Sequence, residues 1–244
     1  MGYLINHSRL SKVIPTKDAG CLASKLSSVL SSDSWKGRRC FVICGGPSLA
    51  DFDPNLLQNE LTIGINKSFV RFSTTINYAM DQRLYDSVTY PNRKDSSCVS
   101  FHQKWSAYRG LKVFLKYSGK WTFDPSVYVV DNIKKRALSL DVGTGIFSGN
   151  NSGFGGMMLA IALGCTQIYL LGCDLKVDSV SKKTHWHDGY AHQKFESVQN
   201  ILPKFIKEFS SFSSIINKQG ISVVNLNPDS ALTCFPTEVI QNVL

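Results

Sequence analysis

Short apolar runs that each end at a polar or glycine residue constrain the fold of this chain more than any other feature. The first three runs, each with the residue that follows it, are 40–44 with Gly45, 61–65 with Asn66, and 76–80 with Asp81. Uninterrupted apolar runs of this length are typical of strands buried on both faces, as in a parallel sheet. The pattern therefore predicts parallel strands whose carboxyl ends carry small or polar residues.

The rest of the chain alternates further strand candidates with two helix candidates. The strand candidates are 98–101, 112–116, 127–130, 168–171 and 221–226, and the helix candidates are 153–163 and 194–218. This alternation predicts an α/β fold, Rossmann-like, with a mostly parallel sheet and helices on both faces. We expect one domain over 38–244, preceded by a basic arm or peripheral helix over 1–37 with a helical candidate near 20–31.

Residues 153–173 contain no charged side chain and are numerous enough to span a membrane. Asn151 and Ser152 form a helix N-cap signal, however, and Gly164 is placed to end the helix before a strand begins. The sequence therefore predicts a buried helix followed by a buried strand and no membrane span.

The charge balance favours an anionic partner. Lys and Arg number 27 against 18 Asp and Glu, which gives a formal charge of +9. The excess is concentrated in 1–40 and 101–140, whereas 141–175 contain no Lys or Arg. Seven cysteines without a Cys-x-x-Cys pair predict free thiols, and the start of the chain shows no export signal, so we expect a cytoplasmic protein.

The residues at the strand ends predict one binding crevice. Ligands of open parallel sheets bind beyond the carboxyl ends of the strands. The residues expected to bind a nucleotide there are Gly45, Gly46, Pro47, Ser48, Asn66, Asp81, Asn151, Ser152 and Gly153, and Asp174 follows the strand at 168–171. Taken singly, each has an ordinary structural explanation: a tight turn at the glycines, an N-cap at 151–153, and turn closure at Asn66 and Asp81.

The segment 185–192 holds three of the five histidines. A histidine can act as a general base near neutral pH, and the His-x-His spacing of His185 and His187 can hold a metal ion in an extended backbone. A third possibility is a structural loop with solvated imidazoles. His192 and His187 are the candidate bases, and Asp174 joins them in the candidate catalytic set.

Several motifs in this order resemble a known group of proteins. They are CGGPSL at 44–49, GINKSF at 64–69, the segment 151–175, HWHDGYAH at 185–192 and NPDSALTCFP at 227–236. The set is similar to phage-borne proteins of the archaeal hydroxymethylpterin diphosphokinase-like family and to motility-associated flagellin glycosyltransferases. It resembles bacterial lipooligosaccharide sialyltransferases more distantly.

The resemblance implies a transferase on a Rossmann-like fold. The sialyltransferase pattern implies that Gly46, Pro47, Ser48, Asn66 and Ser152 hold a cytidine nucleotide, and that His192 is the catalytic histidine. Two departures are Gly45, where that pattern has Asn, and the absence of a clear match to its tyrosine pair beyond Tyr190.

These observations lead to three functional hypotheses. The first is a glycosyltransferase that uses a nucleotide sugar without requiring Mg²⁺, with an anionic acceptor such as modified phage DNA or an acidic glycan. The second is an ATP-dependent diphosphokinase-like enzyme in which Asp81, Asp174 and His185 hold Mg²⁺. The third is a non-catalytic nucleotide-binding phage accessory protein.

Overall fold

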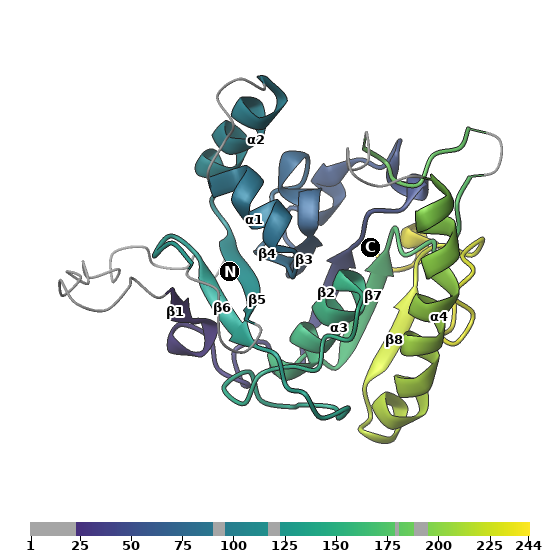
Figure 1. Ribbon diagram of the computed structural model, residues 1–244. Helices are drawn as coiled ribbons and strands as arrows, with labels where there is room; N and C mark the ends of the chain where they lie inside the picture. The colour runs from purple at the N-terminus through teal and green to yellow at the C-terminus, as the bar shows by residue number, and fades with distance from the viewer. Residues whose placement is uncertain (1–22, 90–95, 117–122, 179–180, 188–194) are drawn as a thin grey trace.

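The computed structural model describes residues 23–89, 96–116, 123–178, 181–187 and 195–244 (Figure 1). Eight parallel strands form one twisted sheet in the order β1-β6-β5-β4-β3-β2-β7-β8. The strands are β1 (Ser24–Lys25), β2 (Arg39–Ile43), β3 (Thr62–Ile65), β4 (Ile76–Ala79), β5 (Leu111–Lys116), β6 (Tyr128–Asp131), β7 (Gln167–Leu171) and β8 (Ser222–Asn225). The predicted α/β fold with a parallel sheet is confirmed.

Helices cover both faces of the sheet, as predicted (Figure 1). The helices α3 (Ser152–Ala162) and α4 (Phe195–Lys218) belong to one face, and α1 (Gln82–Thr89) and α2 (Ser96–Ala107) to the other. The 3₁₀ segments η3 (Pro47–Leu49), η4 (Pro54–Leu57) and η5 (Asn66–Val70) also pack on the α1 and α2 face. Two further 3₁₀ turns are η2 (Leu26–Ser28) and η6 (Ile240–Asn242).

Alternation along the strands explains the two layers. Tyr78 of β4 points to the α3 face and Ala79 to the α1 face, and in β5 Phe114 points away from its neighbours Val113 and Leu115. All five side chains are fully buried. A strand places successive side chains on opposite faces, so an apolar run without alternation fills both layers of the core.

The segment 153–173 is a helix followed by a strand, as expected. Asn151 caps α3 by accepting a hydrogen bond from the Phe154 amide at 3.0 Å, and Gly164 follows the end of the helix with a φ of +97°. The next strand, β7, is the neighbour of β2. Within the described residues, no helix has both the length and the apolarity needed to cross a membrane.

Two local expectations are corrected. The expected strand at 98–101 lies inside α2, where Phe101 and Trp105, one helical turn apart, both pack edge-on against Phe69. The expected helix near 20–31 is β1 followed by η2 in its described part, and Leu26 is fully buried in the core. The described end of the 1–37 segment is therefore part of the same sheet and core. The rest of that segment, 1–22, lies outside the described residues.

Candidate functional site

The strand order places a topological switch point between β2 and β7. The chain proceeds from β2 through β3, β4, β5 and β6 on one side, and then crosses through α3 to β7 on the other side of β2. At such a point the loops leaving the two central strands diverge and leave a crevice beyond their carboxyl ends. Here the diverging segments are 44–48 after β2 and 172–176 after β7.

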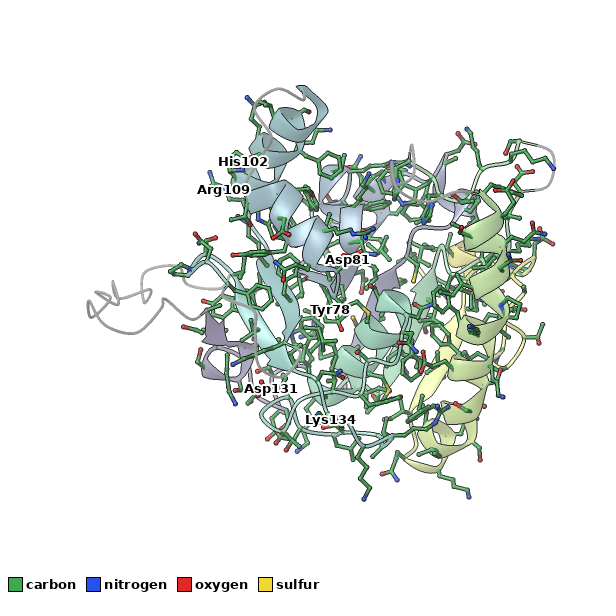
Figure 2. The ribbon with its side chains drawn as sticks, viewed as in Figure 1. Tyr78, Asp81, His102, Arg109, Asp131 and Lys134 are labelled. Atoms are coloured by element: carbon green, nitrogen blue, oxygen red, sulfur yellow. The ribbon has the colours of Figure 1, made fainter. Side chains whose placement is uncertain are left out.

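A cavity of about 680 Å³ lies at this switch point. The residues predicted from the sequence that line it are Gly45, Gly46, Asn66, Asp81, Asn151, Ser152, Gly153, Asp174, His185 and His187. Pro47 and Ser48 do not line it, and His192 falls outside the described residues. Figure 2 shows Asp81 at the cavity side of the sheet, beyond Tyr78 of β4. Volumes of this size are typical of sites for small organic ligands.

The Asp174 carboxylate fixes the loop that follows β2. Its Oδ2 accepts a hydrogen bond from the Ser48 amide at 2.8 Å, and its Oδ1 accepts from the Ser48 hydroxyl at 2.5 Å and from Asn227 Nδ2 at 2.8 Å. A side chain at Gly46 would overlap this carboxyl group and the Gly172 carbonyl. Asp174 is therefore a reason why residue 46 has to be a glycine.

Asn227 was missed as a site residue by sequence reasoning. It belongs to the NPDSALTCFP motif, to which no role was assigned. Its Nδ2 donates a hydrogen bond to Asp174 Oδ1, and its own Oδ1 accepts one from the Asp229 amide at 3.0 Å. No sequence signal identifies it, because Asn227 acts through a contact with Asp174 that only the fold creates.

The proposed Mg²⁺ ligands Asp81, Asp174 and His185 all line the one cavity. Across the described parts of the chain, no three His, Cys, Asp or Glu side chains come together as metal ligands. The Asp174 oxygens are occupied by Ser48 and Asn227, and Asp81 Oδ1 accepts from the Arg83 amide at 2.8 Å at the start of α1. Both oxygens of Asp174 and one oxygen of Asp81 are thus hydrogen-bonded to protein groups, and the Mg²⁺ set stays a prediction.

The first turn of α3 lies directly on the strand ends. A side chain at Gly153 would lie 2.9 Å from Cys44 Sγ, and one at Gly155 would lie 2.7 Å from the Tyr78 hydroxyl. The glycines therefore let the helix start approach the sheet closely. The amides of the first helical turn have no partner within the helix and carry partial positive charge. Ser152 and Gly153 line the cavity at this end, which suits an anionic group.

Glu208 of α4 supports the loop that leads into α3. This buried carboxylate accepts a hydrogen bond from the Asn150 amide at 2.9 Å. A side chain at Gly149, whose φ is +56°, would overlap it. The position of the α3 start is thus fixed from both sides, by the sheet and by α4.

Asn66 is held in a strained conformation at the cavity. Its φ is +53°, in the left-handed region, and its buried side-chain Oδ1 has no hydrogen-bond partner within the described ranges. The fully buried Asn77 holds this geometry, because its Nδ2 donates to the Asn66 carbonyl at 2.9 Å and its Oδ1 accepts from the Phe69 amide at 3.1 Å. Strain that the surroundings impose in this way is typical of functional positions.

Gln82 adds a second unpaired acceptor. Its Nε2 donates to Asp86 at 2.7 Å, and its buried Oε1 has no partner among the residues that the structure describes. Both Asn66 and Gln82 line the cavity, so it has polar amide side chains on this side.

His185 and His187 form one edge of the cavity. Their rings stack with centroids 4.9 Å apart, and His185 Nδ1 lies 2.8 Å from the Thr184 hydroxyl. The Trp186 amide donates to the Gly45 carbonyl at 3.0 Å, which ties this loop to the one after β2. Burial, together with the positive charge of Lys67, lowers the pKa of His185 to about 4, so this imidazole is neutral at physiological pH.

One wall of the cavity was not predicted as part of the site. The apolar stripe of the 194–218 helix reads as a core face, and Phe209, Phe212 and Ile216 are indeed buried. The N-terminal half of α4 instead lines the cavity, through Ser197, Val198, Ile201, Leu202 and Phe205. Helical periodicity identifies an apolar face but does not tell a core contact from a ligand contact.

The basic excess of 101–140 does not contribute to the cavity. No described residue of that segment lines it, and the lining cations are Arg83 and Lys176. In Figure 2, Lys134 and Arg109 both lie away from Asp81. The charge of the described part of this segment therefore lies outside the cavity.

Comparison with known proteins gives one structural likeness. No family model matches the chain, and no curated protein matches it. The fold is similar to that of a solved structure described as a MAf glycosyltransferase from Magnetospirillum magneticum AMB-1, with a TM-score of 0.52 and 13% sequence identity. The match covers 92% of this chain and 36% of that chain, so this chain spans about a third of that protein's length. The likeness establishes a Rossmann-like fold shared with a glycosyltransferase.

Proposed function

We propose that this chain is a glycosyltransferase that binds a nucleotide-sugar donor in the cavity at the switch point between β2 and β7. The observation that carries the proposal is the convergence of the α3 N-terminus, the Gly45–Gly46 turn and Asn66, held at a φ of +53°, in one cavity. A helix start suits a phosphate, and polar side chains such as Asn66 and Gln82 suit a base or ribose. The similar fold of a glycosyltransferase supports the proposal that the transferred group is a sugar.

The nucleotide phosphate is assigned to the first turn of α3, beside Ser152 and Gly153. Lys176 and Arg83, which also line the cavity, would meet the charge that develops on the leaving phosphate. The base and ribose are assigned to the side of Asn66 and Gln82. The resemblance of the 44–49 and 64–69 motifs to sialyltransferases favours a cytidine nucleotide.

In the proposed reaction, an acceptor hydroxyl oxygen attacks the anomeric carbon of the sugar. A new carbon–oxygen bond forms, the bond from that carbon to the phosphate oxygen breaks, and the leaving nucleotide keeps the electron pair. The hydroxyl proton passes to a histidine, for which His187 and His192 are the candidates. His185 is assigned a packing and hydrogen-bonding role, because its low pKa makes it a weak base.

A thermal-shift screen tests the proposal. Cytidine, uridine and guanosine nucleotides and their sugar conjugates, together with ATP, are added to the full chain with Mg²⁺ or with a chelator. We expect one nucleotide class to raise the melting temperature in the chelator as well. Stabilisation by ATP alone and only with Mg²⁺ would favour the diphosphokinase-like alternative. Nucleotide binding without sugar hydrolysis or transfer would favour a non-catalytic binding protein.

A further inference from the structure

The N-terminal half of α4 presents apolar side chains to the cavity. Val198, Ile201, Leu202 and Phe205 face the cavity rather than the core, and Ile201 keeps 38% of its surface exposed. None of these side chains carries charge, and Ser197 is the other α4 residue in the lining. A contiguous apolar wall inside a cavity is typical of a site that contacts an apolar part of a ligand.

The other walls of the same cavity are polar. They include the start of α3, the amide residues Asn66 and Gln82, and the cations Arg83 and Lys176. The hydrogen-bonding edges of a nucleotide and its phosphate match these groups. The side chains of α4 in the lining offer the nucleotide no hydrogen-bond partner other than Ser197. This wall is therefore free to contact the acceptor.

We propose that the acceptor carries a small apolar group next to its reactive hydroxyl, and that this group packs on the N-terminal half of α4. The inference rests on the proposed function, because it assumes that the nucleotide occupies the polar walls. It concerns the part of the acceptor inside the cavity. An aliphatic chain and an aromatic ring share the required chemistry, and the experiment separates them.

Phosphate esters test whether the apolar residues of α4 bind an apolar group, without an acceptor having to be known. Inorganic phosphate, butyl phosphate, hexyl phosphate and phenyl phosphate are titrated calorimetrically into the full chain. We expect affinity to rise roughly 2- to 4-fold per methylene from butyl to hexyl phosphate, because each added methylene is removed from water. A stronger gain with hexyl than with phenyl phosphate indicates an aliphatic acceptor group, and the reverse indicates an aromatic one.

A matched pair of variants tests whether the rise in ester affinity with chain length comes from contact with α4. Ile201→Gln should flatten the rise with chain length, whereas Ile215→Gln should preserve it. Both residues are isoleucines of α4 with comparable exposure, 38% and 44%, but Ile215 does not line the cavity. Partial exposure makes both substitutions compatible with folding, which the melting temperature of each variant checks.

Three results would overturn the inference. The first is equal affinity for inorganic and hexyl phosphate, or no ester binding while a nucleotide binds. The second is an unchanged rise in Ile201→Gln. The third is a loss of nucleotide affinity in Ile201→Gln as large as the loss for the esters, because the wall would then hold the base. In each case nucleotide binding that depends on Asn66 would leave the proposed function standing.

Discussion

Ser48 and Asp174 are joined by two hydrogen bonds, one from the Ser48 amide and one from its hydroxyl, across 126 positions of sequence. This pair connects the loop after β2 to the loop after β7, which are the two sides of the switch point. The Asp174 carboxylate therefore holds these two loops together.

Replacing Asp174 by Asn should therefore destabilise the protein. An amide nitrogen in place of one carboxylate oxygen would face the Ser48 amide or the Asn227 amide, so that two donors meet in a buried site. We expect a loss of about 2–3 kcal/mol in the free energy of unfolding, measured by urea denaturation. Asp51→Asn, at an exposed position, serves as the control and should change stability by less than about 0.5 kcal/mol. Equal stability of both variants would contradict this structural role.

Asn66→Gly should separate stability from binding. Glycine adopts a φ of +53° without strain, so we expect stability to stay level or rise by up to about 1 kcal/mol. The same change removes the unpaired amide, and nucleotide affinity should fall by about 10-fold, the equivalent of one good hydrogen bond. Calorimetric titration beside urea denaturation measures both quantities. Undiminished affinity would show that the Asn66 side chain does not contact the nucleotide.

A turnover experiment distinguishes the two candidate bases, His187 and His192. His187→Ala and His192→Ala should each leave nucleotide affinity within a few-fold, while the variant that lacks the true base loses about 100-fold or more in turnover. Single-turnover transfer or hydrolysis of the donor is the measurement. His102→Ala on α2 is the control, because His102 does not line the cavity. Full activity in both loop variants would return the 185–192 segment to a purely structural role.

The pKa of His185 predicts a pH dependence of stability. Its value falls from 6.5 to about 4 on folding, so between these values the unfolded chain binds more protons than the folded chain. The contribution of His185 is complete above about pH 6.5 and is lost as the pH falls toward 4. His185→Gln, neutral at every pH, should flatten the change of urea midpoint over this window. A variant as pH-sensitive as the original chain would refute the buried neutral imidazole.

Salt dependence tests whether the basic segments bind DNA. If 1–40 and 101–140 follow the phosphates of a duplex, log affinity should fall linearly with log salt as salt rises from about 50 to 200 mM. Fluorescence anisotropy with labelled duplexes measures this slope. Binding that is undetectable at low salt, or that ignores salt, would exclude DNA as the anionic partner and leave an acidic glycan.

The grouping of the residues that follow the strands was predictable from sequence, because it depends only on the parallel arrangement of the backbone. Apolar runs in a parallel sheet bring the residues after them to one edge, so Gly45, Asn66 and Asp81 had to meet in space. The partners of these residues were not predictable. The contact of Asp174 with Ser48 and Asn227 depends on tertiary placement, and the same carboxylate fits a metal ligand, a base or a structural link in sequence alone.

The strand predicted at 98–101 failed for a different reason. A four-residue apolar run fits a buried strand and one turn of a helix equally well, and packing of Phe101 and Trp105 on Phe69 decides for the helix. The stripe of α4 shows the same limit at a larger scale. Its period identifies a helix face correctly, but it does not tell that Ile201 lines the cavity while Phe209, farther along α4, packs against Phe154 of α3.

The three glycines in the first turns of α3 restrict how this site can change. Gly153, Gly155 and Gly156 have Cys44, Tyr78 and Ile65 within 2.9, 2.7 and 2.5 Å of where a side chain would begin. A larger residue here would have to displace these side chains or lift the start of the helix, together with its positive end, from the strand ends. Change in this cavity, in evolution or in engineering, is therefore more accessible through α4 and the 181–187 loop than through the glycines of α3.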